Sequence, residues 1–158
     1  MLKKIYNKVT HEWDTSVEEA LKSFIRLPAL SPDFDKKWEE NGVLLKALED
    51  AQAWAEKQGI KGLRCEIIKD DGFTPCLFVE VDATSDKKFE RSVFFYGHLD
   101  KQPPNEGWDP DKSAWEPVIQ NGRLYGRGAV DDGYAFYTSL AAVKALQTLG
   151  IPHPRCVG

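Results

Sequence analysis

The chain has 158 residues, of which 42% are hydrophobic and 29% are charged, and its 21 basic and 25 acidic side chains leave a formal net charge of −4. This length and composition are typical of one globular domain. No basic block stands out and no apolar run approaches the length of a membrane span, which argues against nucleic acid and membrane as partners. The three cysteines are odd in number and match no zinc motif, so we expect reduced, buried thiols in a cytoplasmic protein.

The amino-terminal part of the chain is expected to form two helices. The first begins with a Ser-Val-Glu-Glu capping box at Ser16 and continues as an apolar stripe to Ile25. The second is predicted over 35–58, with Gly59 as its C-terminal cap. Its buried stripe consists of Leu44, Leu48, Ala51 and Ala55.

Strand-like segments follow these helices. Residues 63–68 and 77–82 are separated by a turn-rich tetrapeptide, and 92–97 is predicted to be the central strand because its apolar run suggests burial on both faces. The stretch 101–122 is too long for a plain turn and is a candidate functional loop, and 133–149 is predicted to be a buried helix. This order of elements indicates an α/β sandwich.

His98 and Asp100 stand at the end of the apolar segment 92–97. On an extended backbone, side chains two residues apart project to the same face. The pair can serve a metal site in two ways: Asp100 holds the second ring nitrogen of a metal-bound His98, or both side chains bind the ion. The alternative is a histidine satisfied at a strand end with Asp100 capping a loop, and His-x-Asp alone does not decide between them. The other histidines, His11 and His153, are expected at the surface.

Asp131 and Asp132 directly precede the predicted helix 133–149. Aspartates at that position can simply accept hydrogen bonds from the backbone N–H groups of the helix. Two adjacent carboxylates also repel each other unless a cation or several donors offset them, which favours a metal, although Arg127 could supply that offset. The residues alone therefore predict an α/β domain with a divalent-metal site whose acidic ligand set is incomplete.

Two longer motifs contain these residues. They read Gly-His-Leu-Asp-Lys-Gln-Pro over 97–103 and Asn-Gly-Arg-Leu-Tyr-Gly-Arg-Gly-Ala-Val-Asp-Asp-Gly over 121–133. With Gly107-Trp108, Trp115 and Pro117 between them, they resemble the M20 family of metallopeptidases, and most closely its carnosine-dipeptidase-like branch. The detailed similarity covers about 93–150 of the chain.

The resemblance implies a three-layer α/β/α sandwich with a mixed sheet and two divalent metal ions, usually Zn²⁺, with Mn²⁺ or Co²⁺ as alternatives. His98 would ligate one ion, Asp131 would bridge both, and Asp100 would orient His98. A cis peptide bond between Asp131 and Asp132 is also implied. In the family, the metals activate a shared water and a glutamate removes its proton. That glutamate and the remaining ligands would lie beyond Gly158.

Residues 155–157 look like the beginning of another strand, and a domain rarely ends at such a point. We therefore expect residues 1–158 to be an amino-terminal portion of the catalytic domain, without the lid and dimerisation domain of the family. Gly133 stands where many members carry a lysine, which predicts an altered branch or substrate preference.

Three functions follow as hypotheses. The first is metal-dependent hydrolysis of the peptide bond in dipeptides or short peptides by a homodimeric full-length protein. The second is an amidohydrolase that acts on N-acyl amino acids. The third is a non-catalytic fragment or interaction module, because these residues hold at most two direct ligands and no general base.

Overall fold

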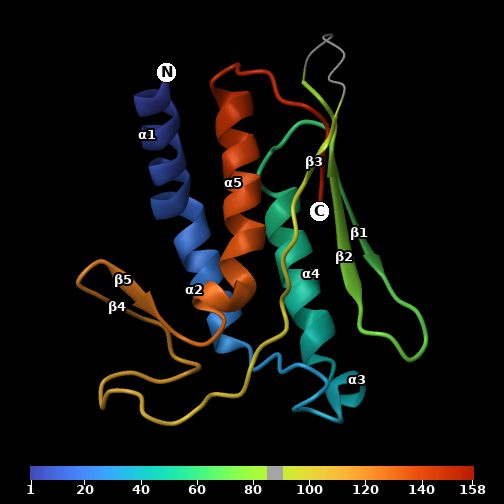
Figure 1. Ribbon diagram of the computed structural model, residues 1–158, viewed down its shortest axis with the longest axis vertical. Helices are drawn as coiled ribbons and strands as arrows, with labels where there is room; N and C mark the ends of the chain where they lie inside the picture. Colours follow the sequence, from blue (N-terminus) through green and yellow to red (C-terminus); the bar gives the residue numbers. More distant parts are fainter. Residues whose placement is uncertain (85–90) are drawn as a thin grey trace.

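The computed structural model describes residues 1–84 and 91–158. Among the described residues, helices pack against one face of a mixed sheet (Figure 1). The predicted α/β class and the mixed sheet are confirmed, and the second helix layer of a three-layer sandwich stays a prediction. Within the same ranges, no helix combines the length and the apolarity that crossing a bilayer requires.

The amino-terminal helix is one continuous rod. α1 (Leu2–Glu12) passes through a π-helical turn (Trp13–Val17) into α2 (Glu18–Arg26). The predicted capping box at Ser16 is therefore wrong, because the chain is already helical when it reaches that residue. The Ser16 hydroxyl instead accepts a hydrogen bond from Trp54 Nε1 at 3.1 Å. A contact between two helices thus takes the place of a local cap.

The predicted helix over 35–58 is divided at Gly42. α3 (Trp38–Asn41) ends there because Gly42 adopts a left-handed φ of 67°, and α4 (Val43–Glu56) begins at the next residue. Gly59 has a left-handed φ of 66°, but the C-cap of α4 is Lys57, so the cap predicted at Gly59 is wrong by two residues. The predicted stripe is confirmed by the burial of Leu44, Leu48, Ala51 and Ala55.

The main sheet has the strand order β1-β2-β6-β3. Its strands are β1 (Leu63–Ile68), β2 (Cys76–Val81), β3 (Val93–Phe94) and β6 (Cys156–Val157). β2 is antiparallel to β1 and β6, whereas β3 is parallel to β6. The strand expected at 155–157 is confirmed. The central strand predicted at 92–97 is wrong: β3 is short and lies at the edge, and Phe94 is 72% exposed. An apolar run shows which side chains could be buried, but the position of a strand in the sheet decides whether they are.

The loop predicted over 101–122 carries part of a small hairpin. β4 (Val118–Gln120) pairs with β5 (Arg123–Tyr125), and the chain then enters α5 (Tyr134–Thr148). α5 lies between the α1–α2 rod and α4, close to its predicted bounds (Figure 1).

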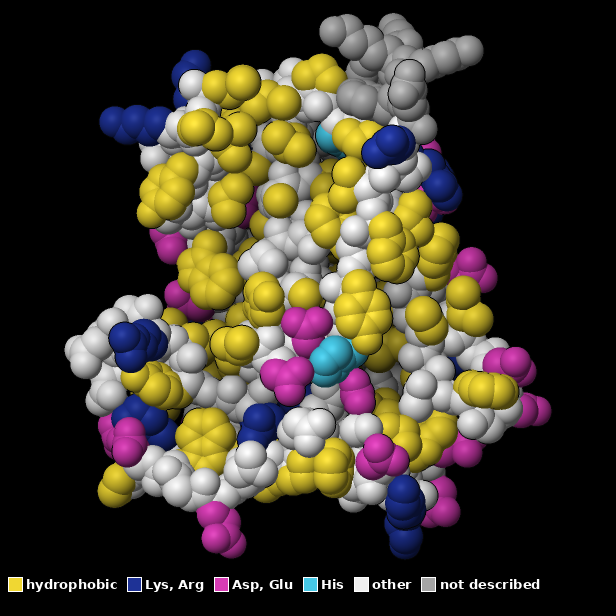
Figure 2. Space-filling view, in the orientation of Figure 1, with side chains coloured by type: hydrophobic (Ala, Val, Ile, Leu, Met, Phe, Trp, Pro, Cys, Tyr) yellow, Lys and Arg dark blue, Asp and Glu magenta, His cyan; other side chains and the backbone are white. Residues whose placement is uncertain are grey.

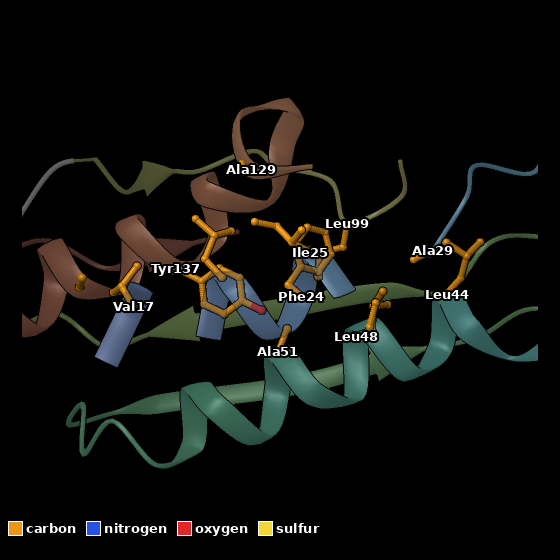
Figure 3. Packing of buried hydrophobic residues seen from close by; sticks show 13 residues of the cluster. Val17, Phe24, Ile25, Ala29, Leu44, Leu48, Ala51, Leu99, Ala129 and Tyr137 are labelled. Atoms are coloured by element: carbon orange, nitrogen blue, oxygen red, sulfur yellow. The ribbon is translucent and has the colours of Figure 1, made fainter. Parts of the chain in front are cut away.

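Two apolar clusters form the core. One joins α2, α4 and α5, with Phe24, Leu48 and Tyr137 among its members (Figure 3). The other lies between the helices and the sheet, where Val81 of β2 packs with Leu140 of α5. Both clusters hold α5 in place, so the start of α5 has a defined position relative to the sheet.

A buried ion triplet joins α1 to α5. The Glu12 carboxylate is 4% exposed and pairs with Lys8 Nζ at 2.6 Å and with Lys144 Nζ at 2.7 Å. Burial acts to raise the pKa of Glu12, but the hydrogen bonds and charges of the two lysines hold that pKa below its usual value of 4.5. The stabilisation is therefore present above the pKa of the unfolded chain and is lost as the pH falls through the lower folded pKa.

We expect Glu12→Gln to lower the free energy of unfolding at pH 7 by about 2 kcal/mol, because two ammonium groups lose a charged acceptor. Urea unfolding at pH 7 and near pH 3 measures this, and the difference from the parent chain should shrink at the lower pH. The control is Glu19→Gln, whose carboxylate is 74% exposed and should matter little. An equal loss at both pH values would contradict the triplet's role.

Candidate metal centre

The structure brings His98 and Asp131 together from two distant segments. His98 lies four residues beyond the end of β3, and Asp131 lies three residues before α5 begins. His98 Nε2 is 3.2 Å from Asp131 Oδ1. The two segments that carry the predicted site residues therefore lie next to each other. Near the middle of the face in Figure 2, a histidine is bordered by acidic side chains.

Asp100 holds the other nitrogen of the ring. His98 Nδ1 is 3.0 Å from Asp100 Oδ1 and 3.1 Å from the Asp100 carbonyl oxygen. A proton on Nδ1 is donated to Asp100, which leaves Nε2 facing Asp131. Partial burial acts to lower the pKa of His98, but the hydrogen bond to Asp100 and the nearby carboxylates raise it overall.

The two simpler explanations for Asp131 and Asp132 receive no support. The residue at the N-cap of α5 is Gly133, which has no side chain, so neither aspartate occupies that position. Among the described residues, no salt bridge joins Arg127 to either carboxylate. The peptide bond between Asp131 and Asp132 is cis, as the resemblance implied.

Both site segments are rooted in the core. Leu99, between His98 and Asp100, is buried in the helical cluster, as is Ala129, two residues before Asp131 (Figure 3). Gly97 permits the close approach of the segments, because a Cβ there would lie 3.1 Å from Ala135 Cβ at the start of α5.

The donor atoms fit a divalent ion, though as a partial set. Two donors bound to one tetrahedral zinc ion, each about 2.0 Å from it, lie about 3.3 Å apart. The 3.2 Å separation of His98 Nε2 and Asp131 Oδ1 matches that spacing. Throughout residues 1–84 and 91–158, no group of three or more His, Cys, Asp or Glu side chains gathers as a metal-binding cluster. The chain therefore presents one imidazole nitrogen and one carboxylate oxygen at a separation that suits a shared ion, and further ligands would complete the site.

A largely apolar cavity of about 550 Å³ lies beside the pair. His98 and Asp100 are among its lining residues, and α4, β2, β6 and α5 supply much of the rest. The cavity also reaches Gly158, so it runs from the site to the end of β6.

The other two histidines, His11 and His153, differ in their exposure to solvent. His11 is exposed as predicted, but the prediction for His153 is wrong, because that side chain is 2% exposed. His153 Nδ1 lies 2.8 Å from the Pro154 carbonyl oxygen, and Nε2 lies 3.1 Å from Gln147 Nε2. A histidine between prolines looks exposed from its neighbours alone, but here it fills the space beside α5.

The three cysteines are free thiols, as expected. Cys156 is buried and Cys65 is partly buried, whereas Cys76 is exposed, so the expectation of buried thiols is wrong at Cys76. Burial raises the pKa of Cys156, and burial together with Glu56 raises that of Cys65 to about 11. These two thiols are therefore protonated at neutral pH and are poor nucleophiles.

Sequence reasoning overlooked Lys101, which is 1% exposed. A lysine is normally assigned to the surface. Its place directly after His-x-Asp in the motif is the signal that could have drawn attention to it.

The fold and site together define an α/β protein with a candidate divalent-metal centre between a strand end and a helix start. Residues 94–158, which include both site segments, match peptidase family M20/M25/M40. The chain is similar to the Beta-Ala-His dipeptidase of Mus musculus, with 37% identity over 78 residues that make up 46% of this chain and 15% of that protein. It is also similar to a succinyl-diaminopimelate desuccinylase of Acidiphilium cryptum (strain JF-5), with 49% identity over 51 residues, or 32% of this chain and 13% of that protein.

The crystal structure of human carnosine dipeptidase 1 has the same fold in this region, with a TM-score of 0.73 at 22% identity. That similarity covers 99% of this chain and 33% of the human chain. The chain thus spans about a third of the length of this solved relative. Its similarity to peptidase family M20/M25/M40 lies in residues 94–158, which contain both site segments.

Proposed function

We propose that these residues supply part of the active centre of a metal-dependent hydrolase that cleaves the peptide bond of dipeptides or short peptides. One observation carries the proposal: His98 Nε2 faces Asp131 Oδ1 at 3.2 Å while Asp100 holds Nδ1, all on segments within the family match. The dipeptidase among the relatives supports the substrate class.

His98 and Asp131 are the residues that would hold the metal. A bound divalent ion supplies Lewis-acid activation of water and of the scissile carbonyl. Asp100 acts on His98 rather than on substrate: by accepting the Nδ1 proton it keeps Nε2 available as a donor and holds the ring in one orientation. Asp131 is 59% exposed at its side chain, which leaves its carboxylate open to further ligands and to solvent.

The proposal extends to the whole protein, of which residues 1–158 would form the amino-terminal portion of the catalytic domain. A general base, further ligands and a lid or dimerisation domain would come from outside these residues, and the whole protein would be a cytoplasmic homodimer. The ions would be a pair, most commonly Zn²⁺, with Mn²⁺ or Co²⁺ as alternatives. The part of this proposal that concerns residues outside 1–158 is supported by the length of the matched relatives, which exceeds by far the stretches they share with the chain.

The second candidate is an amidohydrolase that removes an acyl group from an N-acyl amino acid. The desuccinylase relative favours it, with 49% identity over the matched 51 residues. His98, Asp100 and Asp131 serve both reactions equally, because each reaction attacks an amide carbonyl. Substrate choice therefore depends on groups other than these three.

The test is release of free amine from Cys-Gly, β-Ala-His and N-succinyl-diaminopimelate, with and without added Zn²⁺ or Mn²⁺. For the whole protein we expect metal-stimulated cleavage of the dipeptides, lost on metal chelation. Cleavage of the succinylated substrate alone would establish the second candidate. For residues 1–158 alone we expect metal binding without measurable turnover, because two ligands and no general base are present. No metal-stimulated cleavage of any of the three by the whole protein would overturn both candidates.

A further inference from the structure

Lys101 is a buried lysine that the proposed chemistry does not use. Its ammonium nitrogen donates to the carbonyl oxygens of Phe24 at 2.6 Å, Ile25 at 3.2 Å and Leu27 at 2.6 Å. These carbonyls belong to the last turn of α2 and to its C-cap Leu27, where the helix dipole favours a cation and each carbonyl oxygen can accept more than one hydrogen bond. Three acceptors match the three N–H bonds of a lysine ammonium, while burial lowers the pKa of Lys101 to about 7.

The main chain of Lys101 is fastened to the same region. Its N–H donates to the Ala29 carbonyl oxygen at 2.8 Å, and its carbonyl accepts from Ser31 N–H at 2.9 Å. Side chain and backbone thus both tie the residue after Asp100 to the segment 24–31. The segment that carries His98 is anchored at its far end by this connection.

The stem of Lys101 also supports the segment that carries Asp131. A Cβ at Gly128 would lie 2.7 Å from Lys101 Cε, and a Cβ at Gly133 would lie 2.3 Å from the Phe24 ring. The Lys101 ammonium in turn lies 3.9 Å from the centroid of that ring. Lys101 and Phe24 therefore form one support, and the turn from Gly128 to Gly133 rests directly on it.

From these contacts we infer that Lys101 is a positioning residue that sets the separation of His98 and Asp131 for a shared divalent ion. The inference rests on the proposed metal site. His98 and Asp131 come from different segments, and each segment has its own contacts with the Lys101–Phe24 support. Removal of the ammonium takes one donor from each of three carbonyls, although Phe24 O and Leu27 O keep the backbone donors Leu27 N–H and Ala29 N–H. The support then loosens, and the distance between the two ligands is no longer fixed.

The test is Zn²⁺ titration of the 158-residue chain, followed by NMR through the ring protons of His98. The chain has three histidines, and comparison with His98→Ala assigns the His98 signals. We expect Lys101→Met to weaken zinc binding by about tenfold or more, the usual effect of losing a group that orients a ligand. All titrations are run at a temperature where each variant is fully folded.

Two controls separate positioning from general effects. Lys112→Met makes the same chemical change at a lysine whose side chain is 6% exposed and pairs with Asp109 and Asp111. Glu12→Gln lowers stability far from the site. Both should keep the parent affinity within about twofold, a threshold well below the effect of losing an orienting group. If Lys101 only stabilised the fold, the zinc affinity of Lys101→Met would stay as close to that of the parent chain as the affinities of these two controls.

A second variant keeps the inference testable if Lys101→Met does not fold. Gly133→Ala keeps the Lys101 side chain but drives a methyl group against the Phe24 ring of the same support, at an ordinary φ of −52°. It should weaken zinc binding by displacing Asp131. Parent-like affinity in Lys101→Met, or in Gly133→Ala if the former is unfolded, overturns the inference while leaving the metal site standing. No response of the His98 signals to zinc in the parent chain overturns the metal site and this role together.

Discussion

We expect His98→Ala to weaken Zn²⁺ binding by the chain about a hundredfold or more, because a first ligand is lost rather than an orienting group. His98 Nε2 is the nitrogen donor that faces Asp131, and without it the ion meets an exposed carboxylate in water. A single exposed carboxylate holds a divalent ion weakly. The measurement is a zinc titration at pH 7, followed through the backbone amide signals of Val130 and Asp131, which remain in the variant.

Two comparison variants make this result specific. Asp100→Asn keeps the shape of the residue that holds Nδ1 but removes its charge, so we expect an intermediate loss of about tenfold. His11→Ala removes an exposed histidine on α1 and should leave the titration unchanged. If His98→Ala titrated like the parent chain, the contact between His98 and Asp131 would be an ion pair within the protein rather than part of a metal centre.

The second large effect is expected at Tyr137, which is 2% exposed in the helical cluster. Its ring centroid lies 4.9 Å from that of Trp54 and 6.4 Å from that of Phe24, so it joins α5 to both α4 and α2. Tyr137→Ala should lower the free energy of unfolding by about 4 kcal/mol, through lost apolar burial and the cavity that remains. Domains of this size have about 5–15 kcal/mol in total, so the variant would be close to unfolding.

Tyr137→Phe is the matched control, because it keeps the ring and removes only the hydroxyl. No hydrogen bond of that hydroxyl is found among the described residues, so the change should stay within about 1 kcal/mol. Urea unfolding, followed by far-UV circular dichroism and by tryptophan fluorescence, gives both numbers. A loss in Tyr137→Phe as large as in Tyr137→Ala would show that the hydroxyl, not the ring, stabilises the cluster.

The helices were predictable to the extent that local patterns describe them. The stripe from Leu44 to Ala55 recurs at helical spacing and is buried as expected. The capping box at Ser16 was misleading, because its hydroxyl accepts a hydrogen bond from Trp54, a residue 38 positions away. β3 was misjudged for a related reason: its apolar residues do not reveal that, within the described part of the chain, β6 is its one pairing partner.

At the candidate site, the sequence specified the residue types and their order. Glycine, histidine and aspartate at a strand end, and a pair of aspartates before a helix, identify donor atoms because side-chain chemistry is local. The spacing of the two motifs also predicted the similarity to the M20 family that residues 94–158 show. Whether the two segments meet was not determined by these motifs, because more than thirty residues separate His98 from Asp131 and either could have faced solvent.

Tertiary structure alone decided that meeting and the support beneath it. The burial of Leu99 and Ala129 in one cluster brings the segments together, and the Asp100 contact turns Nε2 of His98 toward Asp131. Lys101 shows the same division: its type predicts a solvated surface charge, yet its side chain is buried and donates to carbonyl oxygens at the end of α2. The kind of donor atom follows from the type of each residue. The distance between donor atoms and their burial depend on contacts between residues far apart in the chain.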